Sequence, residues 1–349
     1  MIDIAAPASA LPRASAKSAD RTIAHWLFAC CAMIFAMVVI GGITRLTESG
    51  LSIVEWRPVS GILPPLSDAA WQAEFDKYRQ IDQYRLMNAG MSLEAFKTIY
   101  FWEWFHRFWG RLIGIVFAVP FFWFVLRGQL RGRQAVKLFA LFCLGGLQGL
   151  IGWWMVSSGL KPDMLAVSQY RLATHLSLAL ALYLGLLWTA LGLRFGPSPG
   201  SPAGFAVLAL VFTTAMAGAF VAGLDAGLAY NTFPLMDGAL VPAGYGDIAP
   251  FWRNLFENHA TVQFNHRWLG IASLVALSLL AWRLFKSVPR AAIAMALAGA
   301  AQVALGIATL LLWVPIPLAA AHQAGSVVLL TAVAVAVHAA GLKQAQRKE

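Results

Sequence analysis

The sequence has few charged residues for its length. Asp, Glu, Lys and Arg make up only 12% of its 349 residues, whereas a soluble domain carries about 25%. Because 59% of the residues are apolar, this composition excludes an ordinary soluble enzyme and a disordered chain. The three cysteines, Cys30, Cys31 and Cys143, all lie inside apolar runs. No loop disulfide and no cysteine-ligated zinc site is therefore expected.

Long apolar runs make up most of the chain. A helix needs about 20 mostly apolar residues to cross a bilayer, and no run shows the alternating polarity of a barrel strand. Backbone groups in lipid must be hydrogen-bonded within the protein, which leaves helices. We therefore expect an all-α integral membrane protein with eight transmembrane helices. The expected spans are residues 22–44, 104–126, 137–157, 169–192, 203–224, 264–285, 290–312 and 319–341.

The distribution of Lys and Arg predicts the orientation of these helices. The net charge is +10, and the basic residues gather in both tails (1–21 and 342–349) and in the gaps after the second and sixth spans. If the helices alternate, all four groups lie on one side. The positive-inside rule makes that side, and both termini, cytoplasmic. The long gaps 45–103 and 225–263 then face outward. No basic stripe is present, so no nucleic-acid partner is expected.

A set of motifs recurs in the two halves of the chain in the same order. It consists of a His-Arg pair, a Gln-x-x-x-Gly segment and a second histidine. The two copies are His106-Arg107, Gln148–Gly152 and His175, and then His266-Arg267, Gln302–Gly306 and His322. This repetition predicts two four-helix bundles of one design, at residues 22–192 and 203–341. We interpret Gln148 and Gln302 as interhelical hydrogen-bond partners rather than ligands.

Four histidines near the outward ends of the even-numbered spans are the candidate metal ligands. Ionisable groups inside a membrane are costly and usually functional. Two imidazoles at similar depth on different helices suit a haem iron, which takes them as axial ligands. We therefore expect His106 with His175, and His266 with His322, each to hold one haem. The alternative for any single histidine is a hydrogen bond between helices.

Neighbouring residues fit this interpretation. Gly110 and Gly270 follow the first histidine of each pair by four residues, so they share its helix face and leave room for a porphyrin. They could equally be packing positions. Arg107 and Arg267 could pair with a haem propionate or simply extend to the membrane interface.

One acidic residue distinguishes the halves. Glu103 precedes His106 by three residues, whereas Gln263 stands at the matching position before His266. A carboxylate beside a haem edge can act as a general base or stabilise a developing cation. The first half is therefore predicted to be reactive and the second to transfer electrons. The alternative is an interfacial carboxylate that pairs with Arg107 or with a loop cation.

Longer stretches of the sequence resemble the haem A synthase family, in the branch shared by proteobacteria and mitochondria. The matching stretches are residues 41–52, 74–80, 96–97, 103–107, 230–236, 263–267 and 322–323, within a resemblance that covers about 22–340. The resemblance implies oxidation of the C8 methyl group of haem O to a formyl group, giving haem A for cytochrome oxidase. It implies successive hydroxylation, with electrons passed through a bound haem b.

The resemblance also implies roles for the site residues. Haem b maps onto His266 and His322, the substrate haem O onto His106 and His175, and the family's essential glutamate onto Glu103. It implies a haem O synthase and cytochrome oxidase assembly factors as partners, besides the lipid bilayer and an electron acceptor that the sequence does not name. The expected location is the cell inner membrane, and a mitochondrial inner membrane is less favoured.

Besides a haem transporter or chaperone with one exchangeable haem, two alternatives stay open at this stage. One is a dihaem cytochrome b-type electron carrier that leaves its haem unmodified, for which the asymmetry at Glu103 has no use. The other concerns assembly: small residues over 291–308 could pack within the chain or form a homo-oligomer.

Overall fold

The regular structure of the protein is helical. The computed structural model describes residues 13–57 and 60–347, and within them it contains eight helices long and apolar enough to cross a membrane. The predicted class, an all-α membrane protein with eight spans, is confirmed. These helices are α1 (Arg13–Leu46), α4 (Leu93–Leu126), α5 (Gly132–Gly159), α6 (Gln169–Phe195), α7 (Pro202–Gly223), α9 (His259–Leu284), α10 (Pro289–Leu311) and α11 (Ile316–Gln346).

Several helices extend beyond the predicted spans. Helix α1 begins at Arg13 and α11 continues to Gln346, so parts of both predicted tails are helical, while 1–12 and 348–349 lie outside the described residues. Helix α4 begins at Leu93 instead of residue 104. Its first turns pack on the short helix α2 (Asp68–Tyr78) in a buried aromatic cluster. A hydropathy window detects only the apolar part of such a helix.

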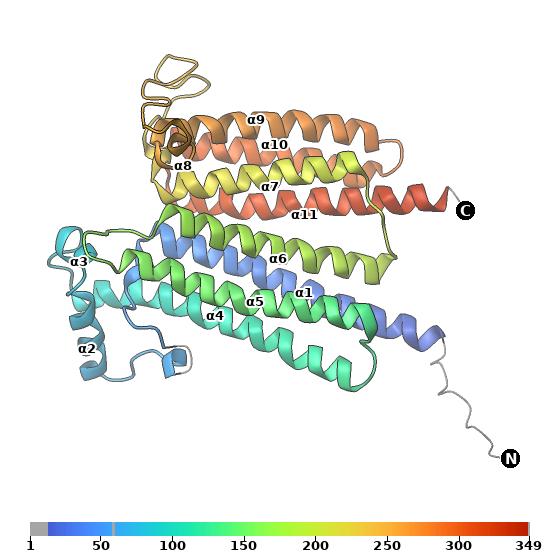
Figure 1. Cartoon of the computed structure of the whole chain (residues 1–349), viewed down its shortest axis with the longest axis horizontal. Coiled ribbons are helices and arrows are strands. Elements are labelled where there is room, and N and C mark those ends of the chain that lie inside the picture. Colours follow the sequence, from blue (N-terminus) through green and yellow to red (C-terminus); the bar gives the residue numbers. More distant parts are fainter. Residues whose placement is uncertain (1–12, 58–59, 348–349) are drawn as a thin grey trace.

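The helices run between two ends of the molecule (Figure 1). One end, called the loop end here, carries the short helices α2, α3 (Asp82–Leu86) and α8 (Asn254–Glu257). The start of α1 and the end of α11 lie at the opposite end, together with the basic connections α4–α5 and α9–α10. The predicted grouping of the basic segments on one side agrees with this arrangement. Which side is cytoplasmic stays a prediction.

Local sequence signals set several helix boundaries. Ser92 Oγ accepts a hydrogen bond from Ala95 N at the start of α4, and Asn258 caps α9 in the same way through Thr261 N. Side-chain acceptors at this position satisfy backbone N–H groups that the helix leaves free. Helix α6 ends at Gly196, whose φ of 103° suits a residue without Cβ.

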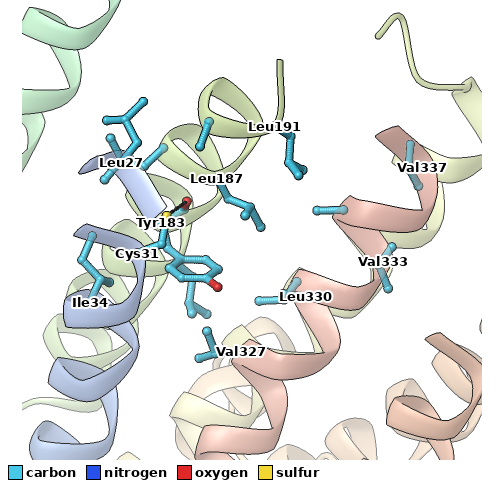
Figure 2. Close-up of a cluster of buried hydrophobic side chains, with 14 of the residues drawn as sticks. Leu27, Cys31, Ile34, Tyr183, Leu187, Leu191, Val327, Leu330, Val333 and Val337 are labelled. Carbon is cyan, nitrogen blue, oxygen red and sulfur yellow. Dashed lines mark hydrogen bonds between the residues drawn. The ribbon is translucent and has the colours of Figure 1, made fainter. Parts of the chain in front are cut away.

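The spans pack in two groups of four. In the N-terminal half, α1 and α5 each contact α4 and α6; in the C-terminal half, α7 and α10 each contact α9 and α11. The halves meet where α11 packs on α1 and α6, and where α6 packs on α7. Figure 2 shows side chains of α1, α6 and α11 converging there. The labelled members are Leu27, Cys31, Ile34, Tyr183, Leu187, Leu191, Val327, Leu330, Val333 and Val337.

A proline in α4 explains one contact between helices. Pro120 lies inside α4 and has no N–H to donate to Val116 O, one turn earlier. An unpaired carbonyl in lipid costs free energy. Trp26 of α1 donates its Nε1–H to Val116 O at 2.8 Å and so supplies the missing partner.

Candidate functional site

The two histidines of the C-terminal half lie close together. His266 lies on α9 and His322 on α11, with ring centroids 6.3 Å apart and ring planes at 84°. A metal–imidazole bond is about 2 Å long, and the centre of the ring lies roughly 1 Å further from the metal. Two rings that share one metal therefore have centroids separated by about 6 Å. The spacing is compatible with a single iron between these imidazoles, and haem b at this place stays a prediction.

A backbone contact leaves one nitrogen of His266 free to bind a metal. Its Nδ1 lies 3.1 Å from Thr214 O on α7. When Nδ1 carries the hydrogen, it donates to this carbonyl, and the lone pair of Nε2 is available. The same contact fixes the orientation of the ring.

Each of the four histidines packs against a glycine of a neighbouring span. A Cβ atom at Gly306 would lie 2.8 Å from His322 Cε1, closer than real Cβ contacts allow. The full set of pairs is Gly41 with His106, Gly152 with His175, Gly218 with His266, and Gly306 with His322. A larger residue at any of these glycines would push the imidazole aside. The rings therefore lie directly against helix backbone.

The glycines expected beside the ligands have other surroundings. A Cβ atom at Gly110 would lie 3.3 Å from Met37 Cε, while Gly270 borders open space within 4 Å. Room for a porphyrin beside Gly270 agrees with the sequence-based expectation, and beside Gly110 it stays a prediction.

The histidines of the N-terminal half have a different partner. His106 lies on α4 and His175 on α6. Gln148 Nε2 donates to His175 O at 2.9 Å and also lies 3.2 Å from His175 Nδ1. Gln302 Nε2 donates to His322 O, also at 2.9 Å. Both glutamines form hydrogen bonds between helices, as interpreted from the sequence.

Glu103 is buried and fully engaged by hydrogen bonds. Its side chain is 3% exposed, and its Oε2 accepts from Ser52 Oγ and Ile53 N, both at 2.7 Å. Its Oε1 accepts from Arg107 Nη2 at 2.6 Å. Arg107 also donates to Ile53 O and Glu55 O. The two side chains thus fasten segment 52–55 to α4, which matches the alternative of a carboxylate paired with Arg107.

Gln263 and Arg267 hold the corresponding loop of the C-terminal half. Gln263 Nε2 donates to Ala226 O at 2.8 Å and Tyr230 O at 3.1 Å. Arg267 donates to Tyr230 O and Thr232 O, and also to Gln263 Oε1. Contacts of either arginine with a propionate stay a prediction.

A charged cavity lies beside Arg107 at the loop end. Its volume is about 320 Å³, and Glu55, Arg57, Glu74 and Lys77 are among the lining residues. Lys77 pairs with Glu55 at 3.1 Å and with Glu74 at 2.9 Å. The hydrogen bond from Lys77 lowers the pKa of Glu55. The pair of Lys77 with Glu55 ties α2 to the segment that holds Glu103.

Sequence comparison places the chain among known proteins. The family model COX15-CtaA, described as cytochrome oxidase assembly protein, matches residues 24–334. The chain belongs to this family.

Relatives of this COX15-CtaA protein match nearly its whole length. It is 55% identical to "Heme A synthase" of Rhodospirillum centenum, over 94% of this chain and 91% of the relative. It is 50% identical to "Heme A synthase" of Parvibaculum lavamentivorans, over 94% of this chain and 98% of the relative. It is 49% identical to the protein of that name from Nitrosospira multiformis, over 90% and 92%.

Sequence reasoning missed two of the glycines that contact histidines in this COX15-CtaA protein. Gly41 and Gly218 each stand seven residues before an acidic residue with positive φ, Glu48 (48 − 41) and Asp225 (225 − 218), with φ of 54° and 51°. A short 3₁₀ helix follows in both places. The pattern Gly-x6-acid-x-Gly occurs at 41–50 and 218–227. This spacing could have revealed the match between the first helices of the two halves.

Proposed function

We propose that this COX15-CtaA protein is a haem A synthase, which oxidises the C8 methyl group of haem O to a formyl group for cytochrome oxidase. The 6.3 Å spacing of His266 and His322 carries the proposal, because it suits a six-coordinate iron in a membrane protein. Relatives with the printed name "Heme A synthase", about half identical over most of both chains, support the activity.

In this proposal the two halves are repeats with different tasks. The C-terminal half holds haem b through His266 and His322, and the haem supplies a one-electron redox centre. The N-terminal half takes haem O as substrate at His106 and His175. The contact of Gln148 with the His175 ring supports this division, since a substrate ligand needs a protein partner when the substrate has left. Cytoplasmic termini and an inner-membrane location complete the proposal.

Glu103 is proposed to act on the substrate through its charge. Both of its oxygens are engaged by Ser52, Ile53 and Arg107. Stabilising a positive charge that develops on the substrate requires no change in these bonds. Proton abstraction would require one of these partners to move. Electrostatic stabilisation therefore fits the geometry better than general-base catalysis.

A dihaem electron carrier is the second candidate, and one observation favours it. Glu103 and Gln263 hold corresponding loops, Glu103 by accepting from Ile53 N and Gln263 by donating to Ala226 O. The acidic residue therefore has a structural role that does not require a reaction.

Haem extraction from membranes that contain haem O separates these candidates. The enzyme predicts that the wild-type protein forms a haem with a formyl group, and that Glu103→Gln, which keeps an acceptor for Ser52 and Ile53, loses this product while retaining haem b. Membranes without the protein serve as the control. Unchanged haem O with an intact low-spin spectrum in the wild type would favour the carrier.

A further inference from the structure

The two histidine sites are connected through a contact between α1 and α11. Gln323 directly follows His322 on α11, and its Nε2 donates to Val38 O of α1 at 2.9 Å. Gly41, less than one turn further along α1, packs against His106. The hydrogen bond therefore joins the helix that bears His322 to the backbone that supports His106.

Gly42 makes this contact possible. A Cβ atom at position 42 would lie 2.5 Å from Gln323 Oε1, a distance that real Cβ atoms essentially never show. Val38 lies one turn before Gly42 on the same helix face. The Gln323 amide therefore rests directly on the α1 backbone, at a buried glycine.

The corresponding position of the other half is apolar. Leu176 follows His175 as Gln323 follows His322, and Ala219 follows Gly218 as Gly42 follows Gly41. Leu176 and Ala219 pack in one hydrophobic cluster. Close packing of α6 on α7 beside His175 therefore does not need a hydrogen bond. The polar contact is specific to the boundary between α11 and α1.

We infer that Gln323 is a positioning residue that couples the two histidine sites. A shift of His106 moves the α1 backbone at Gly41, and the Gln323 hydrogen bond transmits this shift to His322. The hydrogen bond joins two helices, α1 and α11. Because a buried amide without its partner costs free energy, this hydrogen bond favours a fixed arrangement of the two histidine sites. This inference rests on the proposed function in that His266 and His322 hold haem b.

A double-mutant cycle on the purified full-length protein with haem b tests the coupling. The readouts are the midpoint potential and the low-spin electron paramagnetic resonance signal of haem b. His106→Ala is expected to shift both in the wild-type background. Gln323→Leu introduces the residue type of Leu176, which stands at the corresponding position of the other half. In this background His106→Ala is expected to leave the midpoint potential and the low-spin signal of haem b unchanged.

Tyr183→Phe provides the matched control. Tyr183 Oη bonds Thr331 Oγ1 at 2.7 Å, which is another hydrogen bond between the halves but touches none of the four histidines. In the Tyr183→Phe background His106→Ala should still shift the midpoint potential and the low-spin signal of haem b. Gly42→Ala is the second test, because its methyl group displaces the Gln323 amide while Gln323 remains; it should abolish the coupling as Gln323→Leu does.

Three outcomes would overturn the inference: no shift with His106→Ala in the wild type, a full shift in Gln323→Leu, or loss of the shift in Tyr183→Phe as well. Haem b content is measured in every variant to show that the fold is retained. Haem A formation is assayed separately, so a failure there with the coupling intact would count against the proposed function alone.

Discussion

In each half a polar side chain and an arginine hold a loop at corresponding positions, but the polar side chain is the charged Glu103 in the first half and the neutral Gln263 in the second. In the N-terminal half, Glu103 and Arg107 fasten the loop after α1; in the C-terminal half, Gln263 and Arg267 fasten the loop after α7. The carboxylate accepts hydrogen bonds from its loop, and the amide donates hydrogen bonds to carbonyl groups of its loop. The scaffold therefore explains why a polar residue is needed at this position, and only the negative charge is left for a special role in the first half.

The histidine pairs differ in a second way. His266 and His322 stand at a spacing that suits one iron, and Gln302 binds only the backbone of His322. In the other half, Gln148 also contacts the ring of His175. A permanent cofactor needs ligands that are already placed, whereas an exchanging substrate needs ligands that are stable alone.

The largest expected effect is the loss of one haem. His322→Ala and His266→Ala should each abolish the low-spin haem b spectrum, because a single imidazole cannot form the six-coordinate iron. His106→Ala should retain the spectrum and impair turnover. Optical spectra of the purified variants measure this. If His106→Ala also lost haem b, the division between the halves would be wrong.

Substitutions of the loop anchors separate scaffold from charge. Glu103→Ala should abolish haem A formation and destabilise the protein by about 3–5 kcal/mol, because it leaves the largely buried Arg107 without its carboxylate. Gln263→Ala should cost less, about 1–3 kcal/mol, since Arg267 loses only a neutral acceptor and keeps its bonds to Tyr230 O and Thr232 O. Unfolding in detergent, followed by helix content, measures both. Equal costs would show that the charge adds nothing to the scaffold.

Glycine substitutions probe how closely the rings lie against backbone. Gly306→Ala should move His322 and shift the haem b spectrum, with an overpacking cost of about 1–3 kcal/mol, because its Cβ would lie 2.8 Å from Cε1. Gly270→Ala borders open space and should change the spectrum less. A larger shift from Gly270→Ala would place the porphyrin against that glycine.

The smallest effect concerns α4 alone. Trp26→Phe should cost about 1 kcal/mol, the typical net value of one hydrogen bond, because Val116 O loses its partner. Helix α9 has Leu280 where α4 has Pro120, each 14 residues after its histidine (280 − 266 and 120 − 106), so it needs no such partner. Thermal unfolding of Trp26→Phe and of Trp26→Phe with Pro120→Leu tests this. The second change should remove most of the cost.

Composition and apolar run length were enough to predict the helices, because the membrane admits few backbone structures. They could not predict where α4 begins, since its first turns pack on α2 outside the apolar run. The four histidines were found through their repeated order. The role of Glu103 as a loop anchor could not be found in this way, because its partners Ser52 and Ile53 lie about 50 residues away.

The same limit applies to contacts between the halves. The hydrogen bond of Gln323 to Val38 O joins residues 285 positions apart. Apolar runs and repeated motifs in the sequence do not indicate which residues so far apart come into contact. The hydrogen bond of Trp26 to Val116 O likewise depends on how α1 lies against α4.

Helix α11 follows the other seven described spans along the chain, yet its most apolar stretch has the largest buried share of the eight, 56%. It touches α1, α6, α7 and α10. The earlier spans must therefore stay in the bilayer with apolar surfaces of α1 and α6 exposed to lipid until α11 has been made. A chain interrupted before α11 would lack both the central packing and His322, one of the two proposed haem ligands, so that the proposed haem b site is completed in the same step as the packing.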